Sequence, residues 1–309
     1  MSIAALFPGQ GSQYAGMADP WEQHAQGRDV LEEASELIGS DLAGACRDDE
    51  LLATTAFAQP ALFACDVAAF RVLRSEGVHV RGAAGHSLGE YAALVAAGVL
   101  TFADAFGLVA ERGAAMQAAA NQLPGTMTAL LGAGATDGAE IVALAAQGDV
   151  LTVANENGPK QVVLAGSVAA IERAEREAKA RKVRAIRLNV AGAFHSPLMA
   201  PALERMRTAL ADVDLAEPTF PVVSNVTGEV IAQPEDLRDL LARHVVSPVR
   251  WERSMTTLDG LGIDTFVEAG PGDVLSKLVK RTVPDAFAVA VGNPDAAAGF
   301  ARQHGEREA

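Results

Sequence analysis

Hydrophobic residues near the start of the chain occur in short runs that alternate with longer stretches of mixed polarity. Residues Ile3–Phe7 form the first run, which ends at a Pro-Gly pair and predicts a short buried strand of a parallel sheet. Residues 20–80 have helical composition, with a break near 54–60. A second short strand is expected within 77–84, and the Ala- and Leu-rich stretch 90–97 favours a helix directly after it.

The pattern of predicted elements changes at Leu123-Pro124-Gly125, where a series of closely spaced short strands and helices begins. We expect strands at 127–131, 151–154, 161–165 and 185–190, helices at 138–147 and 168–182, and a turn at 155–160. The order βαββαβ is the ferredoxin-like arrangement. We therefore predict a small inserted subdomain at residues 124–190, carried by a large α/β subdomain formed by residues 1–123 and 191–309.

The large subdomain is expected to continue the alternation of helices and strands on both sides of the insertion. Helices are predicted at 103–121, 197–211, 234–245, 251–258 and 274–280, and strands at 221–224 and 265–269. The last twenty residues carry little hydrophobic pattern and are expected to fray.

Composition narrows the class of partner. The 309 residues carry a formal net charge of −14, which argues against nucleic acid or an anionic membrane as the main partner. No apolar run approaches the length of a membrane span, the longest being about 92–100. The first residues lack the basic region of a signal peptide. We expect a cytoplasmic monomer.

Neither a metal nor a cofactor is expected. Cys46 and Cys65 sit among apolar neighbours and are interpreted as small core residues. No Cys/His cluster has metal-ligand spacing. The glycine turn at residues 7–13 lacks the Lys-Ser/Thr pair that a P-loop requires.

The strongest chemical signal is Gly85-His86-Ser87-Leu88-Gly89, a G-x-S-x-G pattern between the predicted strand 77–84 and helix 90–97. This context is typical of a nucleophile elbow, in which a sharp turn exposes the serine hydroxyl. The alternative is a glycine-rich turn with a solvated serine. His86 is expected to point away from the serine and to pack or line the pocket.

A nucleophilic serine needs a base, and His195 is the candidate, because it lies in a predicted loop between a strand and a helix. A histidine that merely caps the next helix is the alternative. A backbone N–H group of the glycine turn at residues 7–13 could hold an oxyanion together with that of Leu88, the alternative being a simple loop that ends the strand. Arg112, predicted near the end of helix 103–121, would ordinarily be a surface arginine, but its planar fork suits a carboxylate if it faces the pocket.

Six motifs in order resemble the malonyl-CoA:acyl carrier protein transacylase family, which includes a fatty-acid enzyme and the acyltransferases of polyketide synthases. The resemblance covers about residues 3–290. The motifs are Phe7-Pro8-Gly9-Gln10-Gly11-Ser12-Gln13, Gly85-His86-Ser87-Leu88-Gly89-Glu90-Tyr91, Arg112-Gly113, Gly192-Ala193-Phe194-His195-Ser196, Pro248-Val249-Arg250-Trp251 and Glu268-Ala269-Gly270-Pro271-Gly272.

The resemblance implies an α/β-hydrolase-like large subdomain with the ferredoxin-like insertion. It implies that Ser87 is acylated by malonyl-CoA, that His195 is its base, that Arg112 clamps the malonyl carboxylate, and that an acyl carrier protein accepts the group. The backbone N–H groups of Gln10 and Leu88 would form the oxyanion hole. The side chains expected to contact substrate are Arg112, His86, Met116, Asn157, Phe194 and His244.

His244 departs from the family, which commonly has Gln there. The resemblance implies that this residue orients His195 through its main-chain carbonyl, so the departure bears on pocket polarity and substrate choice. Phe194 resembles the malonyl-selective pattern. Three alternatives stay open: an acyl hydrolase of the same fold, a lipase- or esterase-type hydrolase, and a non-enzymatic module that binds carrier protein.

A basic surface is expected to dock the acidic carrier protein despite the negative total charge. Its candidates are Lys179, Arg181, Lys182, Arg184 and Arg187 on the small subdomain, with Lys277, Lys280 and Arg281 on the large one. Ordinary solvated charges are the alternative interpretation.

Overall fold

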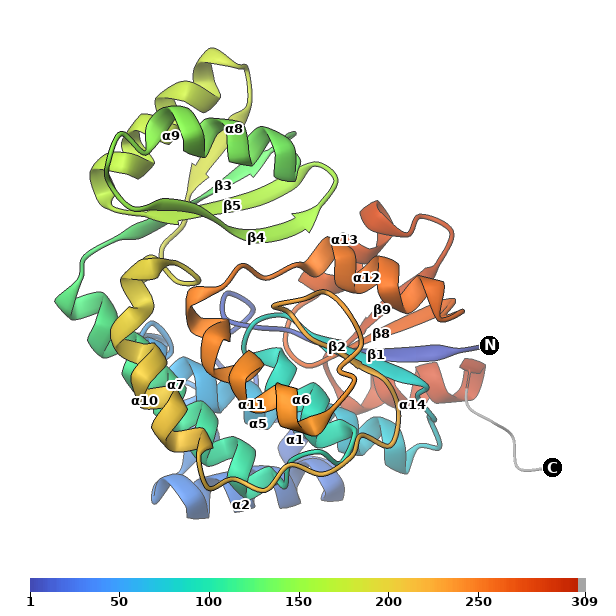
Figure 1. Cartoon of the computed structure of the whole chain (residues 1–309). Helices are drawn as coiled ribbons and strands as arrows, with labels where there is room; N and C mark the ends of the chain where they lie inside the picture. The colour runs from blue at the N-terminus through green and yellow to red at the C-terminus, as the bar shows by residue number, and fades with distance from the viewer. Residues whose placement is uncertain (305–309) are drawn as a thin grey trace.

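The computed structural model describes residues 1–304, and two separate sheets organise it (Figure 1). The larger sheet is parallel, with strand order β7-β2-β1-β8-β9. Its strands are β1 (Ile3–Phe7), β2 (Gly82–Gly85), β7 (Val222–Val223), β8 (Thr265–Ala269) and β9 (Phe287–Val291). β1 and β2 are adjacent, and their register pairs Phe7 with Gly85, so the loops that follow both strands leave the sheet side by side.

The smaller sheet is antiparallel, with strand order β4-β5-β3-β6. Its strands are β3 (Thr126–Leu131), β4 (Leu151–Gly158), β5 (Gln161–Gly166) and β6 (Arg184–Arg187). α8 (Ala135–Ala145) and α9 (Val168–Ala180) cover its outer face, and its inner face points toward the large unit (Figure 1). The α/β fold class with its ferredoxin-like insertion is therefore confirmed, whereas the exact boundaries at 124 and 190 stay a prediction.

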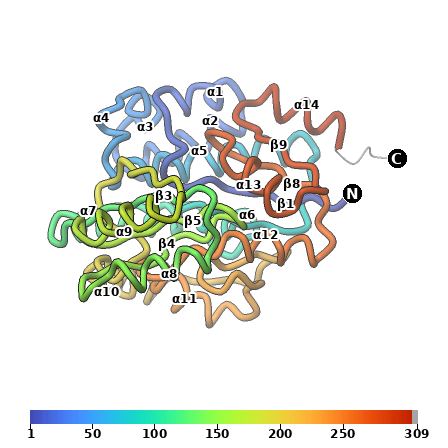
Figure 2. Tube along the Cα trace, turned by 90° about the horizontal axis from the view of Figure 1, so that it is seen from above, coloured from blue at the N-terminus to red at the C-terminus, as the bar shows by residue number. Residues whose placement is uncertain are grey.

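Helices pack on both faces of the parallel sheet, and from above the small unit overlaps α7 and α10 (Figure 2). The longer ones are α2 (Ala25–Ile38), α5 (Thr55–Ser75), α7 (Phe102–Gln122), α10 (Ala200–Leu210), α11 (Pro234–Arg243), α12 (Trp251–Gly260) and α14 (Pro294–His304). The shorter ones are α1 (Asp19–Glu22), α3 (Leu42–Ala45), α4 (Asp49–Leu52), α6 (Gly89–Ala96), α13 (Val274–Thr282) and two 3₁₀ turns, η1 (Pro197–Met199) and η2 (His244–Val246).

The apolar helix α5 corrects one expected boundary. The predicted break at 54–60 is limited to residues 53–54, between α4 and α5, and its extension to Pro60 is wrong because α5 runs through that proline. It is also the one helix of residues 1–304 that is long and apolar enough on average to cross a membrane, although Gln59, Asp66 and Arg71 interrupt its apolar residues. Of the most apolar stretch of this helix, 83% is buried inside the protein. Its hydrophobicity therefore marks a core helix packed between α2 and α7.

Three other boundaries differ from expectation. The strand expected within 77–84 is limited to Gly82–Gly85. β4 continues to Gly158 through register shifts, so Asn157 lies on a bulged strand and not in a turn. The C-terminal segment does not fray over its described part: β9 extends the sheet, and α14 buries Ala297 and Phe300 against α5. Residues 305–309 lie outside the described residues.

Candidate active site

Ser87 occupies a strained turn between β2 and α6. Its φ is +53°, a left-handed value that is uncommon for a residue with a side chain. The flanking glycines are required by close approach: a Cβ on Gly85 would lie 1.9 Å from the carbonyl carbon of Gly89, and one on Gly89 would lie 2.0 Å from the oxygen of Phe7. The turn therefore presents the Ser87 hydroxyl above the sheet, as the G-x-S-x-G pattern predicts.

Asn225 holds this turn in place from the loop after β7. Its Oδ1 accepts the N–H of Ser87 at 2.7 Å, and its Nδ2 donates to the carbonyl of Gly85 at 2.6 Å. The side chain is fully buried. Because the Ser87 amide is engaged by Asn225, it cannot also serve a ligand.

His195 lies directly against the serine. Its Nε2 is 2.7 Å from Ser87 Oγ, and its Nδ1 is 2.9 Å from the carbonyl of His244 and 3.1 Å from that of Ser247. Carbonyl oxygens only accept, so Nδ1 carries the hydrogen and Nε2 is the acceptor. Burial, and then the charge of Arg112, lower the pKa of His195 to about 3. The imidazole is therefore neutral near pH 7 and able to accept the serine proton.

Arg112 projects from the middle of α7 into the same site, which corrects its expected place near the helix end. The residue is 1% exposed, so the surface interpretation is wrong. Its Nη2 donates to Ser87 Oγ at 3.0 Å and its Nη1 to Gln59 Oε1 at 2.8 Å. Its Nε has no hydrogen-bond partner within residues 1–304. Arg112 is not among the residues that line the two cavities beside Ser87, so an anionic ligand would reach this buried guanidinium by replacing Ser87 or Gln59 at an Nη group.

The loop after β1 lies on the elbow. A Cβ on Gly9 would lie 2.3 Å from the carbonyl oxygen of His86 and 3.7 Å from the backbone nitrogen of Leu88. The side chain of Gln10 ties this loop to α5 through Thr55, at 3.2 Å. Within the described chain, the backbone N–H groups of Gln10 and Leu88 donate to no acceptor. Two open N–H groups beside a serine are what an oxyanion requires.

Two adjoining cavities connect this chemistry to the space between the two units. The inner one, about 100 Å³, is lined by Ser87, His195, Met116, Phe194, Gln59 and His86, among others. The outer one, about 180 Å³, shares Gln10, His86, Asn155 and Leu188 with it and adds Asn157 and the start of α13. Asn157 Oδ1 lies 2.8 Å from His86 Nε2, so the bulged strand β4 fixes the orientation of that histidine.

His244 is placed differently from expectation. Its side chain is fully buried behind His195, with the two ring centroids 5.2 Å apart, and it lines neither cavity. The expected contact between this side chain and substrate is therefore wrong. Its main-chain carbonyl does lie against His195, in the position that the resemblance implied.

Several residues around the site were not identified from the sequence. Gln59 orients Arg112, Asn225 holds Ser87, and the carbonyl of Ser247 supports His195. Gln59 carried one signal, a polar residue within the apolar stretch that became α5. Asn225 directly follows a predicted strand, which is where catalytic and supporting side chains gather in parallel sheets.

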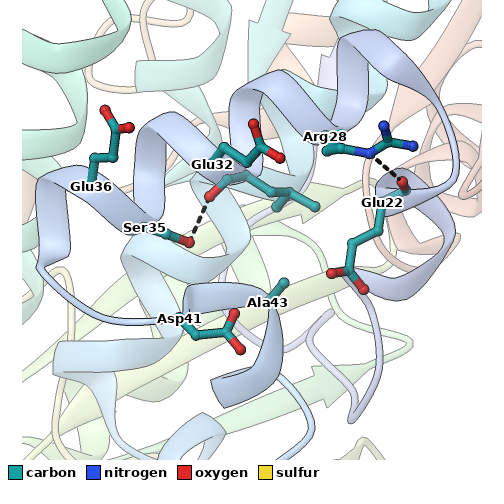
Figure 3. Close-up of a pocket in the computed structure, with 8 residues that line it drawn as sticks. Glu22, Arg28, Glu32, Ser35, Glu36, Asp41 and Ala43 are labelled. Atoms are coloured by element: carbon teal, nitrogen blue, oxygen red, sulfur yellow. Dashed lines mark hydrogen bonds between the residues drawn. The ribbon is translucent and has the colours of Figure 1, made fainter.

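A large hollow is not necessarily an active site. Four of the eight residues that line a depression of about 460 Å³ along α2 are acidic, among them Glu22, Glu32 and Glu36 (Figure 3). Its serine, Ser35, donates to the backbone of its own helix at 2.7 Å. No histidine lines it, so it lacks the base that Ser87 has.

Comparisons with known proteins agree with this geometry. The sequence model of the acyl transferase domain matches residues 5–306. The malonyl CoA-acyl carrier protein transacylase of Bacillus subtilis is 39% identical over 298 residues, covering 95% of this chain and 94% of the relative.

Solved structures agree over nearly the whole chain. The malonyl CoA-acyl carrier protein transacylase of Coxiella burnetii superimposes with a TM-score of 0.95 at 34% identity, covering 99% of this chain and 98% of that one. A malonyl-transacylase in complex with a type II PKS acyl-carrier protein gives a TM-score of 0.93 at 37% identity, covering 96% and 98%. The chain therefore belongs to the acyl transferase family and, within it, to the malonyl-CoA:acyl carrier protein transacylases.

Proposed function

We propose that this chain transfers a malonyl group from malonyl-CoA to the phosphopantetheine thiol of an acyl carrier protein, through an ester on Ser87. The observation that carries the proposal is that Ser87 Oγ contacts both a neutral histidine nitrogen and a buried arginine. The first makes the hydroxyl a nucleophile, and the second places a positive charge where the acyl group must sit. The similarity to malonyl transacylases supports the same reaction.

The proposed first half-reaction acylates the serine. Ser87 Oγ attacks the thioester carbonyl while its proton passes to His195 Nε2. The N–H groups of Gln10 and Leu88 donate to the resulting oxyanion. When the carbon–sulfur bond breaks, coenzyme A leaves as a thiol that takes the proton from His195. The carrier-protein thiol then reverses these steps, and the malonyl group moves from oxygen to sulfur.

The buried positive charge of Arg112 favours a malonyl group, which carries a carboxylate, over a neutral acyl group. A carboxylate beside Ser87 would pair the charge of this buried cation by replacing Ser87 or Gln59 at one of its Nη groups. A hydrolase that clears neutral acyl groups has no use for such a cation, and none of the relatives named above is a hydrolase. We therefore do not favour the hydrolase alternative.

The carrier protein is proposed to dock on the basic residues named above. Some of these residues form ion pairs with acidic residues of this chain, and others do not. Arg181, Arg187 and Lys277 form ion pairs with neighbouring acidic residues. Lys179, Lys182, Arg184 and Lys280 form no ion pair within the described chain, and of these Arg184 in β6 and Lys280 in α13 test one position on each unit. The monomeric state and the cytoplasmic location stay predictions.

The deciding experiment is intact-mass measurement after incubation with malonyl-CoA, acetyl-CoA and methylmalonyl-CoA separately, each with and without a holo carrier protein. We expect one malonyl adduct that is absent in Ser87→Ala and that moves to the carrier protein when one is added. Holo carrier proteins from fatty-acid and polyketide systems should be compared. Rapid loss of the adduct to water, with no transfer, would instead support the hydrolase.

A further inference from the structure

Behind the candidate dyad lies a second pair of buried titratable side chains, which the proposed reaction does not use. Glu90, in the first turn of α6, is 1% exposed, and His244, in η2, is fully buried. His244 Nδ1 lies 3.6 Å from Glu90 Oε2. Neither ring nitrogen of His244 has a hydrogen-bond partner within residues 1–304. A buried N–H without an acceptor is costly, so the Glu90 carboxyl is the polar group that the ring can use after a small adjustment.

A single residue connects Glu90 to each member of the dyad: Asn225 connects it to Ser87, and His244 connects it to His195. On one side its Oε2 accepts the N–H of Asn225 at 3.1 Å, and the side chain of Asn225 accepts the N–H of Ser87. On the other side it faces the ring of His244, whose main-chain carbonyl accepts from His195. A change at this one carboxyl can therefore reach the nucleophile and the base together.

Burial shifts the pKa values of both side chains of the Glu90–His244 pair. Burial raises the pKa of Glu90 to about 8, although a backbone hydrogen bond and the charge of Arg112 act in the opposite direction. Burial lowers the pKa of His244 well below its usual range, and the nearby groups His195, Arg112 and His86 lower it further. Near neutral pH both side chains of the pair are uncharged. A more alkaline pH adds a negative charge on Glu90.

We propose that Glu90 is a positioning residue of the Ser87–His195 dyad, acting on the serine through Asn225 and on the histidine through His244. Its ionised carboxylate lies behind His195, where it stabilises the imidazolium that forms as the serine proton is taken. With an effective dielectric constant of about 20, a charge added about 10 Å from the imidazolium changes the rate of such a step by about tenfold. This inference rests on the part of the proposed function in which Ser87 is the nucleophile.

The test is the rate of single-turnover labelling of Ser87 between about pH 6.5 and pH 9.5, followed by intact mass. Two reagents are used separately, malonyl-CoA and a fluorophosphonate probe that reports serine reactivity without a malonyl group. For the native chain we expect an increase of about tenfold, centred near the pKa of Glu90. Glu90→Gln, which mimics the protonated carboxyl, should keep the low-pH rate and lose the increase.

Glu268→Gln is the matched control. Glu268 is also a buried carboxyl with a pKa raised by burial, but it lies in β8 and accepts the backbone N–H groups of Leu275 and Ser276. Its replacement should leave the pH profile unchanged. His244→Gln, alone and combined with Glu90→Gln, completes a double-mutant cycle, in which we expect the second substitution to add little to the first.

The outcomes separate this inference from the proposed function. A flat profile of the native chain with both reagents, or an unchanged increase in Glu90→Gln, overturns the role of Glu90. Fully additive effects in the cycle overturn the route through His244. Loss of malonyl labelling with a retained fluorophosphonate profile overturns the malonyl substrate alone, and no labelling by either reagent overturns both. If Glu90→Gln fails to fold, as judged by circular dichroism, the native profile and His244→Gln decide.

Discussion

Replacing Arg112 by alanine should convert a malonyl-selective site into one that no longer distinguishes malonyl from acetyl. In the structure the guanidinium is 1% exposed and bonded to Gln59 and Ser87, with Nε unpartnered within residues 1–304. A malonyl carboxylate that enters the inner cavity would pair with this buried charge. An acetyl group would leave the charge unpaired, which is costly away from water.

The magnitude follows from two kinds of contact. A hydrogen bond to a charged group is worth about 1.5–3 kcal/mol, which corresponds to a factor of roughly ten to a hundred in kcat/KM. Arg112 also donates to Ser87 Oγ at 3.0 Å, and this contact is present whichever acyl group is transferred. Its loss should slow both reactions, so the ratio of the two kcat/KM values isolates the carboxylate. We expect this ratio to fall by about ten- to a hundredfold.

The assay measures kcat/KM for malonyl-CoA and acetyl-CoA, with one holo carrier protein as acceptor. Arg112→Lys should restore the ratio only in part, because an ammonium group lacks the planar fork. Arg205→Ala is the control: Arg205 is an exposed arginine of α10 that pairs with Glu111 at 2.6 Å, and its loss should leave the ratio unchanged.

One result would refute this reasoning about Arg112. If the alanine variant keeps the malonyl-over-acetyl preference, the arginine does not read the carboxylate. The neutral-acyl hydrolase alternative would then gain support, since the buried cation would serve only to hold the Ser87 hydroxyl.

Three further predictions follow from the same geometry. His195→Ala should slow acylation by about 10²–10⁴ in single-turnover measurements, and an unchanged rate would remove the histidine from the mechanism. Reversing the charge of Arg184 and Lys280 should raise the KM for carrier protein and weaken its salt dependence, whereas unchanged values would exclude this docking surface.

Urea unfolding should show stability that falls toward acid pH and falls again as the pH rises toward about 8. Burial raises the pKa of Glu90 from 4.5 to about 8, so its contribution is full below about pH 4.5 and is lost as the pH rises through about 8. Burial lowers the pKa of His195 from 6.5 to about 3, so its contribution is lost as the pH falls below about 6.5. Glu90→Gln should flatten the alkaline side, and an unchanged slope there would show that Glu90 is already ionised.

The sequence by itself predicted the features that depend on neighbouring residues. The glycines around Ser87 indicated the elbow, because only glycine tolerates the contacts that this turn makes. The order of strands and helices between residues 124 and 190 predicted the ferredoxin-like insertion, because alternating apolar runs and turn residues are local signals. The ordered motifs pointed to the family, which the comparisons confirm.

Local signals failed where packing against distant segments decided the outcome. Pro60 suggested a break, yet α5 continues through it because the helix is buried between α2 and α7. The weak pattern near the C-terminus concealed β9, which pairs with β8 along its whole length, so its partner lies in another part of the chain. Pairing and burial of this kind do not depend on the sequence of one segment alone.

The tertiary structure alone decided which side chains meet. Ser87, Arg112 and His195 come from a strand-to-helix turn, the middle of a helix and a distant loop. Only the fold brings His195 Nε2 to 2.7 Å and Arg112 Nη2 to 3.0 Å from Ser87 Oγ. It also placed the ring of His244 behind the base and against Glu90, where the sequence suggested a substrate contact. Motifs specify the kinds of group available, whereas the direction in which a side chain points depends on the packing of all the elements around it.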